Sequence, residues 1–509
     1  MSQVVRGAVH RNSYRDSVEL MGMAAELERL PGVARAGLVM ATPANIAVLV
    51  QAGLQDAIGE DAGPSDLIVA VLAADEPAAA AAVERARALL SAAGGDAGGA
   101  AVATVSQTIG EALDELPGAN LALISTPGTY ATAEALKALK HGLNVFLFSD
   151  NVSIEDELEL KQLADRRDRL VMGPDCGTAI IGGIPLGFAN AVRRGPIGIV
   201  AASGTGLQQV SCLIHRFGSG VSHALGTGGR DLDERVGGMT MRAAISRLLA
   251  DPSTEVLVLI SKPPSVGVAA TVLEAVRGAT KPVVVNFLGG DPDSVRRVGA
   301  HPADTFEEAA HLAAELALGR PVPAGTDQDE TVEAPEAAAG LVPRAAILGL
   351  YSGGSLAGEA KLVLRRELGP DRHDRILDLG GDEYTVGRPH PMIDPRLRNE
   401  MVMEAGDDAT VGVLLLDVVL GYGSHPDPAG ALGPSLVVAQ ARARSDGRQL
   451  VCVAAVVGTE DDPQGLALQE DSLRDAGVLL ASSNARAARL AARIAAAAVP
   501  GATRGASGR

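Results

Sequence analysis

Two glycine-rich turns are the clearest candidates for chemistry in this sequence. Each turn follows a short apolar run and precedes an amphipathic helical pattern. Glycine lets the backbone approach a ligand, and the first free N–H groups of a helix, together with the helix dipole, favour negative charge. We therefore predict phosphate binding at Ser203, Gly204, Thr205, Gly206, Ser352, Gly353, Gly354 and Ser355. The alternative is that the glycines only make tight turns, and one such turn alone would be weak evidence.

A proline-rich loop at residues 387–398 concentrates groups that could hold and activate a substrate. Arginine grips carboxylate or phosphate bidentately, and histidine donates to a carbonyl or exchanges a proton near neutral pH. We predict catalytic roles for Arg388 and His390, with Asp394 orienting either of them, and a substrate-binding role for Arg398. The alternative is that this loop is a capped, salt-bridged connection.

Lys262 directly follows an apolar strand pattern, which places it at the carboxyl edge of a parallel sheet, where ligands bind. We predict that it binds substrate, with an ordinary surface lysine as the alternative. Cys176 is expected to be a small buried residue, because no nearby base or cationic cluster would lower its pKa. The three cysteines never form a C-x-x-C pair, so we expect free thiols and no metal site. The acidic run at 460–462 predicts a solvated turn.

The elements that position these residues alternate between strand and helix patterns, and the strands are continuous apolar runs typical of buried parallel strands. The later half of the chain contains a duplication: the order of strand, glycine turn and helix at 345–366 copies that at 197–217. Three further pairs of segments correspond in the same order, namely 225–231 with 377–383, 256–260 with 413–417, and 283–287 with 451–455. The pattern predicts tandem domains of one fold. We expect the two glycine turns to lie near each other at a domain interface, where both helices could face one anion.

Composition narrows the possible partners. A chain of 509 residues requires several cores, and no apolar run approaches the roughly 20 residues that a membrane span needs. No secretory signal pattern is evident, so we expect a cytoplasmic protein. The formal charge of −18 opposes binding to nucleic acid or anionic membrane, and an aromatic content of 2% offers few stacking platforms. Small phosphate or carboxylate substrates fit this composition better.

From about Gly118 onward the sequence resembles the succinyl-CoA synthetases. Gly173-Pro174-Asp175-Cys176 is similar to their Gly-Pro-Asn-Cys motif, the first glycine turn resembles that of the α subunit, and the segment around the second turn resembles the β subunit. The resemblance implies a multi-domain α/β fold in which a Rossmann-like CoA-binding-type domain precedes two tandem flavodoxin-like succinyl-CoA ligase domains. In those enzymes both corresponding helices point at a phosphohistidine.

Parts of the ligase machinery are missing from the sequence. The first 100 residues hold no Gly-x-Thr-Gly-x-x-Gly cradle for CoA, and no Met-Gly-His-Ala-Gly segment follows Gly290. No segment resembles the ATP-grasp half of the β subunit. We therefore expect that no cofactor is required, although CoA binding stays possible.

A resemblance to the FdrA family covers nearly the whole chain. Its motifs here include those at 42–45, 148–152, 173–178, 228–232, 261–264, 384–395 and 414–423. This resemblance implies a subunit of oxamate carbamoyltransferase, which converts oxalurate and phosphate to oxamate and carbamoyl phosphate in purine and allantoin degradation, and which acts in a hetero-oligomer with other carbamoyltransferase subunits. The alternatives are a subunit of an ADP-forming acyl-CoA synthetase of the succinate-CoA ligase type, and a non-catalytic scaffold that binds acyl or carbamoyl phosphate.

Together the patterns and the resemblance predict six segments. They are an N-terminal α/β segment at 1–100, a Rossmann-like CoA-binding-type segment at 101–192, a first succinyl-CoA ligase-like domain at 193–318, a linker at 319–343, a second such domain at 344–499, and a disordered tail at 500–509.

Overall fold

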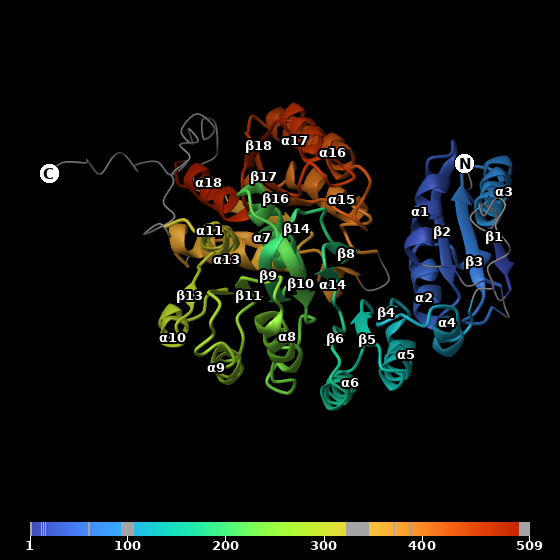
Figure 1. Cartoon of the computed structure of the whole chain (residues 1–509). Helices are drawn as coiled ribbons and strands as arrows, with labels where there is room; N and C mark the ends of the chain where they lie inside the picture. The colour runs from blue at the N-terminus through green and yellow to red at the C-terminus, as the bar shows by residue number, and fades with distance from the viewer. Residues whose placement is uncertain are drawn as a thin grey trace. The chain divides into compact units, whose positions relative to one another are not determined.

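The computed structural model describes residues 3–92 except 12, 14, 16, 60 and 61, residues 106–321, residues 346–385 except 371, and residues 389–497. Nearly all of the predicted linker at 319–343 and all of the predicted tail at 500–509 lie outside the described residues. The chain divides into two compact units (Figure 1). One unit comprises Met1–Ser106 and Asp382–Ile393, and the other comprises Gln107–Gly381 and Asp394–Arg509.

The N-terminal unit contains a three-stranded sheet in the order β1-β3-β2, and both pairings are antiparallel. The prediction of parallel strands is therefore wrong for this region. The central strand β3 is almost entirely buried, so it has the same continuous apolar sequence as a buried parallel strand. The elements are β1 Val4–His10, α1 Ser17–Glu28, β2 Val33–Met40, α2 Pro43–Gln51, η1 Gln55–Ala57, β3 Leu67–Ala73, α3 Glu76–Ala92 and α14 Asp382–Thr385.

The larger unit begins with a three-stranded parallel sheet in the order β4-β5-β6. Side chains of α5 and α6 form a core with this sheet, while Phe146 and Met172 join the core of the following domain. The Ser153 hydroxyl accepts the N–H of Asp156 and so caps the start of α6. The elements are α4 Ile109–Glu115, β4 Leu121–Ile124, α5 Gly128–Lys140, β5 Asn144–Leu147, α6 Ile154–Arg166 and β6 Val171–Met172.

Next comes a seven-stranded sheet in the order β13-β12-β11-β9-β10-β7-β8. Its strands from β9 onward are parallel, whereas the hairpin of β7 and β8 adds antiparallel strands that the sequence patterns did not predict. The elements are β7 Thr178–Ile181, β8 Ile184–Gly187, β9 Arg194–Ala202, α7 Gly204–Arg216, β10 Val221–Gly226, α8 Met239–Ala250, β11 Val256–Ser261, α9 Val266–Glu274, β12 Val283–Phe287, α10 Pro292–Arg297, β13 His301–Pro302 and α11 Phe306–Ala317.

The last sheet has five parallel strands in the order β15-β14-β16-β17-β18. Its elements are β14 Ala346–Tyr351, α13 Gly354–Leu368, β15 Arg375–Asp378, α15 Arg396–Ala405, β16 Val411–Val419, α16 Pro428–Ser445, β17 Val451–Val457, α17 Leu466–Asp475, β18 Val478–Ala481 and α18 Asn484–Ala497.

The two large sheets share one topology. If the strand before each glycine turn is numbered 1, the parallel strands of both sheets run in the order 2-1-3-4-5, which is the flavodoxin-like arrangement. The predicted α/β fold class and the predicted duplication are thus confirmed. The domain boundaries within the larger unit stay predictions.

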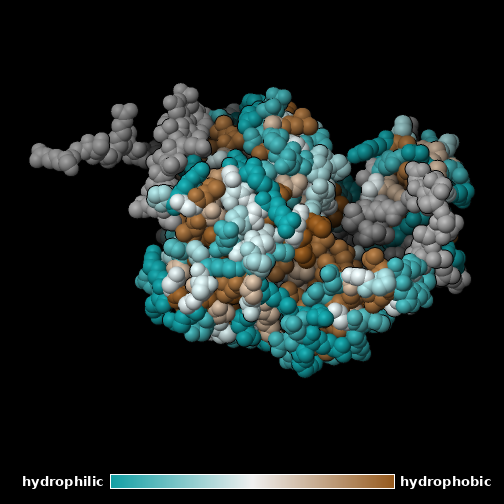
Figure 2. Space-filling model, in the orientation of Figure 1, coloured by the Kyte–Doolittle hydropathy of each residue, from teal (hydrophilic) through white to brown (hydrophobic). Residues whose placement is uncertain are grey.

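The outer helices of the larger unit are amphipathic. Figure 2 shows mostly hydrophilic residues over α6 and α10, whereas Leu160 and Ala164 of α6 are buried. Among the residues that the structure describes, no helix combines the length and the apolar character needed to cross a bilayer.

Candidate functional site

The two glycine turns meet, as the sequence predicted. The Ser203 hydroxyl, before α7, donates a buried hydrogen bond of 2.7 Å to the Ser355 hydroxyl in the first turn of α13. The backbones approach so closely that a Cβ atom on Gly353 would stand 2.9 Å from Cβ of Thr205. The turns therefore lie at the contact between the duplicated domains, and glycine is required at position 353 for packing.

A small pocket opens at the first turn. It is lined by residues that include Asp175, Thr178, Ser203, Gly204, Gly226 and Gly228, and its space measures about 190 Å³ with the solvent opening included. The N-terminal end of α7 adjoins it, where the first N–H groups have no partner within the helix. A Cβ atom on Gly204 would meet only Thr178 Oγ1, at 3.6 Å, so position 204 has room for a side chain at the pocket lining. The predicted phosphate residues Ser203 and Gly204 thus line a small pocket, and their phosphate role stays a prediction.

The second turn contains an internal anion. The Asp417 carboxylate, near the carboxyl end of β16, accepts the N–H of Ser352 at 2.8 Å, the Ser352 hydroxyl at 2.9 Å and the N–H of Gly353 at 2.7 Å. Asp417 thus holds the donors of these two residues, and their predicted phosphate role stays a prediction. The sequence analysis missed Asp417, although a single charge inside the apolar run at 411–419 is a usable signal.

Arg398 forms hydrogen bonds with Asp417. It is buried, and its Nη1 donates to the Asp417 carbonyl oxygen at 2.9 Å and to Oδ1 of the Asp417 carboxylate at 3.2 Å. Burial lowers the pKa of Arg398, and the negative charge of Asp417 opposes that shift. The predicted substrate-binding role of Arg398 stays a prediction, and its observed contacts are with Asp417 and Ser352.

Lys262 lies where the sequence placed it, directly after β11 at the carboxyl edge of its sheet, and it is exposed. Its charge acts on Asp378, at the end of β15 in the other domain. Burial raises the pKa of Asp378, and the positive charge of Lys262 opposes this increase. A Cβ atom on Gly354 would come within 2.2 Å of Oδ2 of Asp378, so a second carboxylate also crowds the second turn.

The predicted catalytic loop is only partly described. Arg388 lies outside the described residues. His390 is half-buried and belongs to the N-terminal unit, and its Nδ1 accepts the N–H of Met392 at 3.2 Å. Asp394 belongs to the larger unit and pairs with Arg396, whose Nε lies 2.8 Å from Oδ2. That pair matches the alternative of a salt-bridged connection, and the catalytic roles of Arg388, His390 and Asp394 stay predictions.

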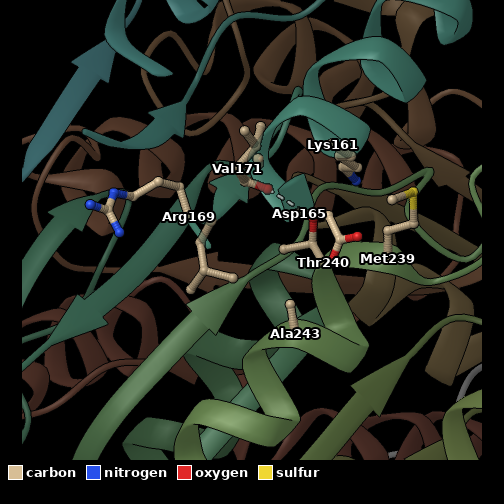
Figure 3. A pocket seen from close by; sticks show the side chains of 9 residues that line it. Lys161, Asp165, Arg169, Val171, Met239, Thr240 and Ala243 are labelled. Carbon is tan, nitrogen blue, oxygen red and sulfur yellow. Dashed lines mark hydrogen bonds between the residues drawn. The ribbon is translucent and has the colours of Figure 1, made fainter. Parts of the chain in front are cut away.

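A buried ion cluster at a second small pocket, lined by Lys161, Met239 and Thr240 among others, was also missed. Nζ of Lys161 on α6 lies 2.8 Å from Oε1 of Glu157 and 2.7 Å from Oδ1 of Asp231, and all three side chains are buried. The carboxylate of Asp231 also accepts two N–H groups at the start of α8. Figure 3 shows Lys161 near Met239 and Thr240, with the hydrogen bond from Thr240 to the carbonyl oxygen of Val171 dashed. The spacing of Glu157 and Lys161, four apart on one helix, is the available sequence signal.

Two further expectations can be compared with the structure. The three cysteines are free, as predicted, and Cys176 is buried, as predicted for that residue alone. Burial raises the pKa of the Cys176 thiol to about 12, which fits a structural residue. The solvated turn predicted at 460–462 is wrong for Asp462. That side chain is buried and accepts hydrogen bonds from the side chain of Asn190 and from the N–H groups of Ala191 and Thr459.

Comparison with known proteins shows which families the sequence resembles. A family model described as CoA-ligase matches residues 350–494, and one described as AllF, heavy metal-associated domain, matches residues 1–105. The succinate-CoA ligase α subunit of Aquifex aeolicus is 31% identical over 31% of this chain and 52% of its own length. Parts of the chain are thus similar to the succinyl-CoA synthetases, and the chain spans about half the length of this relative.

A closer relative defines the family. The uncharacterized protein YahF of Escherichia coli K12 is 42% identical over 96% of this chain and 98% of its own length. The chain belongs to the same family as YahF. Among solved structures, an acetyl-coenzyme A synthetase of Ca. Korarchaeum cryptofilum aligns over 74% of this chain and 83% of its own, with 15% identity and a TM-score of 0.34, which is too low to carry an argument.

Proposed function

We propose that the chain is a subunit of an acyl-CoA synthetase-type enzyme that binds an acyl phosphate, with the phosphate group at the first glycine turn. The observation that carries the proposal is the pocket at the N-terminal end of α7, next to the contact between the two turns. Free backbone N–H groups and the helix dipole stabilise a phosphate there. The similarity to succinate-CoA ligase α subunits supports the same reaction class.

In that reaction the bond between the acyl carbon and the bridging phosphate oxygen breaks, and inorganic phosphate leaves. The acyl carbon bonds to the acceptor, which for CoA is the thiol sulfur after loss of its proton. The chain's part is to hold the phosphate while charge develops on it. Partner chains that contribute the acceptor site or a nucleotide site belong to this proposal.

The test is binding of acetyl phosphate and inorganic phosphate, measured by calorimetry on Gly204→Val. The new side chain has room on the Thr178 side but extends into the pocket, so phosphate affinity should fall at least about tenfold while the fold survives. Gly267→Val is a matched control, because Gly267 lies in the first turn of α9 with no atom within 4 Å of its added Cβ. Equal phosphate affinity in both variants would overturn the proposed site.

Carbamoyl transfer is the second candidate, and Asp175 favours it. Asp175 is exposed and lines the pocket, where its carboxylate can accept an N–H from the amide of a carbamoyl group. The resemblance of the sequence motifs to the FdrA family supports the same reaction. The test is release of carbamoyl phosphate from oxalurate and phosphate by the chain assembled with its partner subunits. An assembled complex that forms acyl-CoA from acyl phosphate and leaves oxalurate unchanged would decide for the first candidate.

A further inference from the structure

We propose that Asp417 is a built-in anion that closes the second glycine turn, so that the chain binds substrate phosphate at the first turn only. The proposal rests on the proposed function for the identity of the ligand at the first turn. The closure of the second turn rests on geometry alone.

The donors of Ser352 and Gly353 in the second turn are already used. Both carboxylate oxygens of Asp417 are engaged, since Oδ1 accepts from the N–H and the hydroxyl of Ser352, and Oδ2 accepts from the N–H of Gly353. These groups immediately precede α13, on the approach that an anion would take to the start of this helix. Asp417 and Ser352 are buried, so water does not compete for these bonds.

The charge of Asp417 is balanced locally. Nη1 of the buried Arg398 lies 3.2 Å from Oδ1 of Asp417, and this contact makes a nearly dry ion pair. A phosphate that entered the second turn would meet a buried carboxylate at hydrogen-bond distance, and like charges in a buried site repel strongly. Asp378, whose carboxylate lies against Gly354, adds a second negative group.

The first turn differs at the position that is equivalent by strand register. This register matches 257–261 with 413–417, so the match predicted from the sequence, 256–260 with 413–417, is shifted by one residue. Ser261 pairs with Ala202, the residue before the first turn, just as Asp417 follows the strand position that pairs with the residue before Tyr351. The Ser261 hydroxyl donates to the carbonyl oxygen of Lys262. Asp175 is the carboxylate in the lining of the first pocket, and it is exposed, so solvent screens its charge more than that of the buried Asp417. The first turn therefore has a serine, Ser261, where the second turn has Asp417. We attribute the closure of the second turn to this aspartate.

The substitution Asp417→Ser places the residue of the first repeat in the second turn. It frees two N–H groups and the Ser352 hydroxyl, and it leaves the buried guanidinium of Arg398 without its anion. A cavity of this kind, the size of a carboxylate and positively charged, should take up formate, which restores the same bonds. Formate should raise the melting temperature of Asp417→Ser at concentrations at least about tenfold lower than any that affect the wild type.

A second variant keeps the test decisive if Asp417→Ser folds poorly. Asp417→Ser with Arg398→Met removes the buried charge together with its partner, and such a neutral replacement is tolerated better than an unpaired ion. This double variant should fold and should lose the formate response. A formate response that is equal in Asp417→Ser, the double variant and the wild type would overturn the proposal.

Calorimetry with inorganic phosphate separates this proposal from the proposed function. The expected result is one phosphate per wild-type chain, with binding that Gly204→Val abolishes. If the wild type binds no phosphate but Asp417→Ser responds to formate, the proposed function fails and the closure of the second turn stands. If two phosphates bind per wild-type chain, the closure is wrong and the proposed function stands.

Discussion

Glu359 is the residue whose titration should be visible in the stability of the protein. It is buried on α13, where Oε1 accepts the N–H of Phe306 at 2.7 Å and Oε2 accepts the side-chain amide of Asn484 at 2.8 Å. Burial raises the pKa of Glu359 to about 7, and the hydrogen bonds from Asn484 and Phe306 oppose this shift. The folded state thus favours the protonated form relative to the unfolded chain.

The free energy of unfolding should therefore depend on pH through Glu359. The folded pKa lies above the unfolded value of 4.5, so the stabilisation is complete below pH 4.5 and is lost as the pH rises through about 7. One proton over this interval corresponds to up to roughly 3 kcal/mol. Urea unfolding of the wild type and Glu359→Gln between pH 4.5 and 8 measures the difference.

Gln cannot titrate, and its amide nitrogen faces one of the two donors, which lowers stability by an amount that does not vary with pH. The stability advantage of the wild type over Glu359→Gln should shrink as the pH rises. A constant difference across the range would show that Glu359 has an ordinary pKa in the fold.

Single residues with long-range partners were the hardest to predict from the sequence. The eight residues of the glycine turns are recognisable because glycine and serine recur at a boundary between strand and helix. The role of Asp417 depends on β16 lying beside β14, a neighbour that is distant in the chain. Asp462 was misassigned for the same reason, since its partners Asn190 and Ala191 come from another domain.

At the scale of elements, Asp462 fastens the loop after β17 to the segment before β9. Replacing it with Ala leaves the N–H groups of Ala191 and Thr459 without their acceptor, and removes one of the two acceptors of the Asn190 amide. Asp462→Ala should lower the free energy of unfolding by roughly 2 to 4 kcal/mol, because buried unpaired donors are costly. Chemical denaturation provides the measurement.

Its neighbour Asp461 is a matched control. The Asp461 side chain is 69% exposed, and Nε2 of His215 lies 4.0 Å from its Oδ2. Asp461→Ala should change stability by no more than about 0.5 kcal/mol. Equal effects of the two substitutions would mean that Asp462 does not fasten these elements.

The elements themselves were predicted well where the sequence repeats and poorly where it does not. Two copies of one pattern specify two parallel sheets of the same strand order. The apolar run Leu67–Ala73 has no second copy in the chain with which it can be compared. A central strand of an antiparallel sheet that is buried on both faces has the same apolar composition as a buried parallel strand, so the sequence does not distinguish the two. The hairpin of β7 and β8 is short and has no repeat partner, so its pattern was overlooked.

At the scale of the larger unit, the duplication gives two equivalent helix N-termini. They differ in that Asp417 lies at the second one and Ser261 takes the equivalent position at the first. The Ser203 and Ser355 hydroxyls join the two copies at the turns. Asp417 then stabilises one copy from within, while the pocket at the other stays open to a ligand. The domain that contains Asp417 can therefore hold the other domain in place without binding a ligand itself. This division agrees with the proposed single phosphate site at the first turn.

The Lys161 cluster joins the first parallel sheet of this unit to the tandem domains, because Lys161 on α6 contacts Asp231 and the carbonyl oxygen of Thr227 after β10. Lys161→Met would leave Asp231 as a buried carboxylate without its cation, and would leave Glu157 with only Arg230 as a cationic partner. It should lower the free energy of unfolding by about 3 to 5 kcal/mol, whereas Lys137→Met, which removes an exposed pair with Glu134 on α5, should cost no more than about 1 kcal/mol. Thermal and urea unfolding of both variants provide the comparison. Equal small losses would show that the cluster does not hold the sheet against the tandem domains.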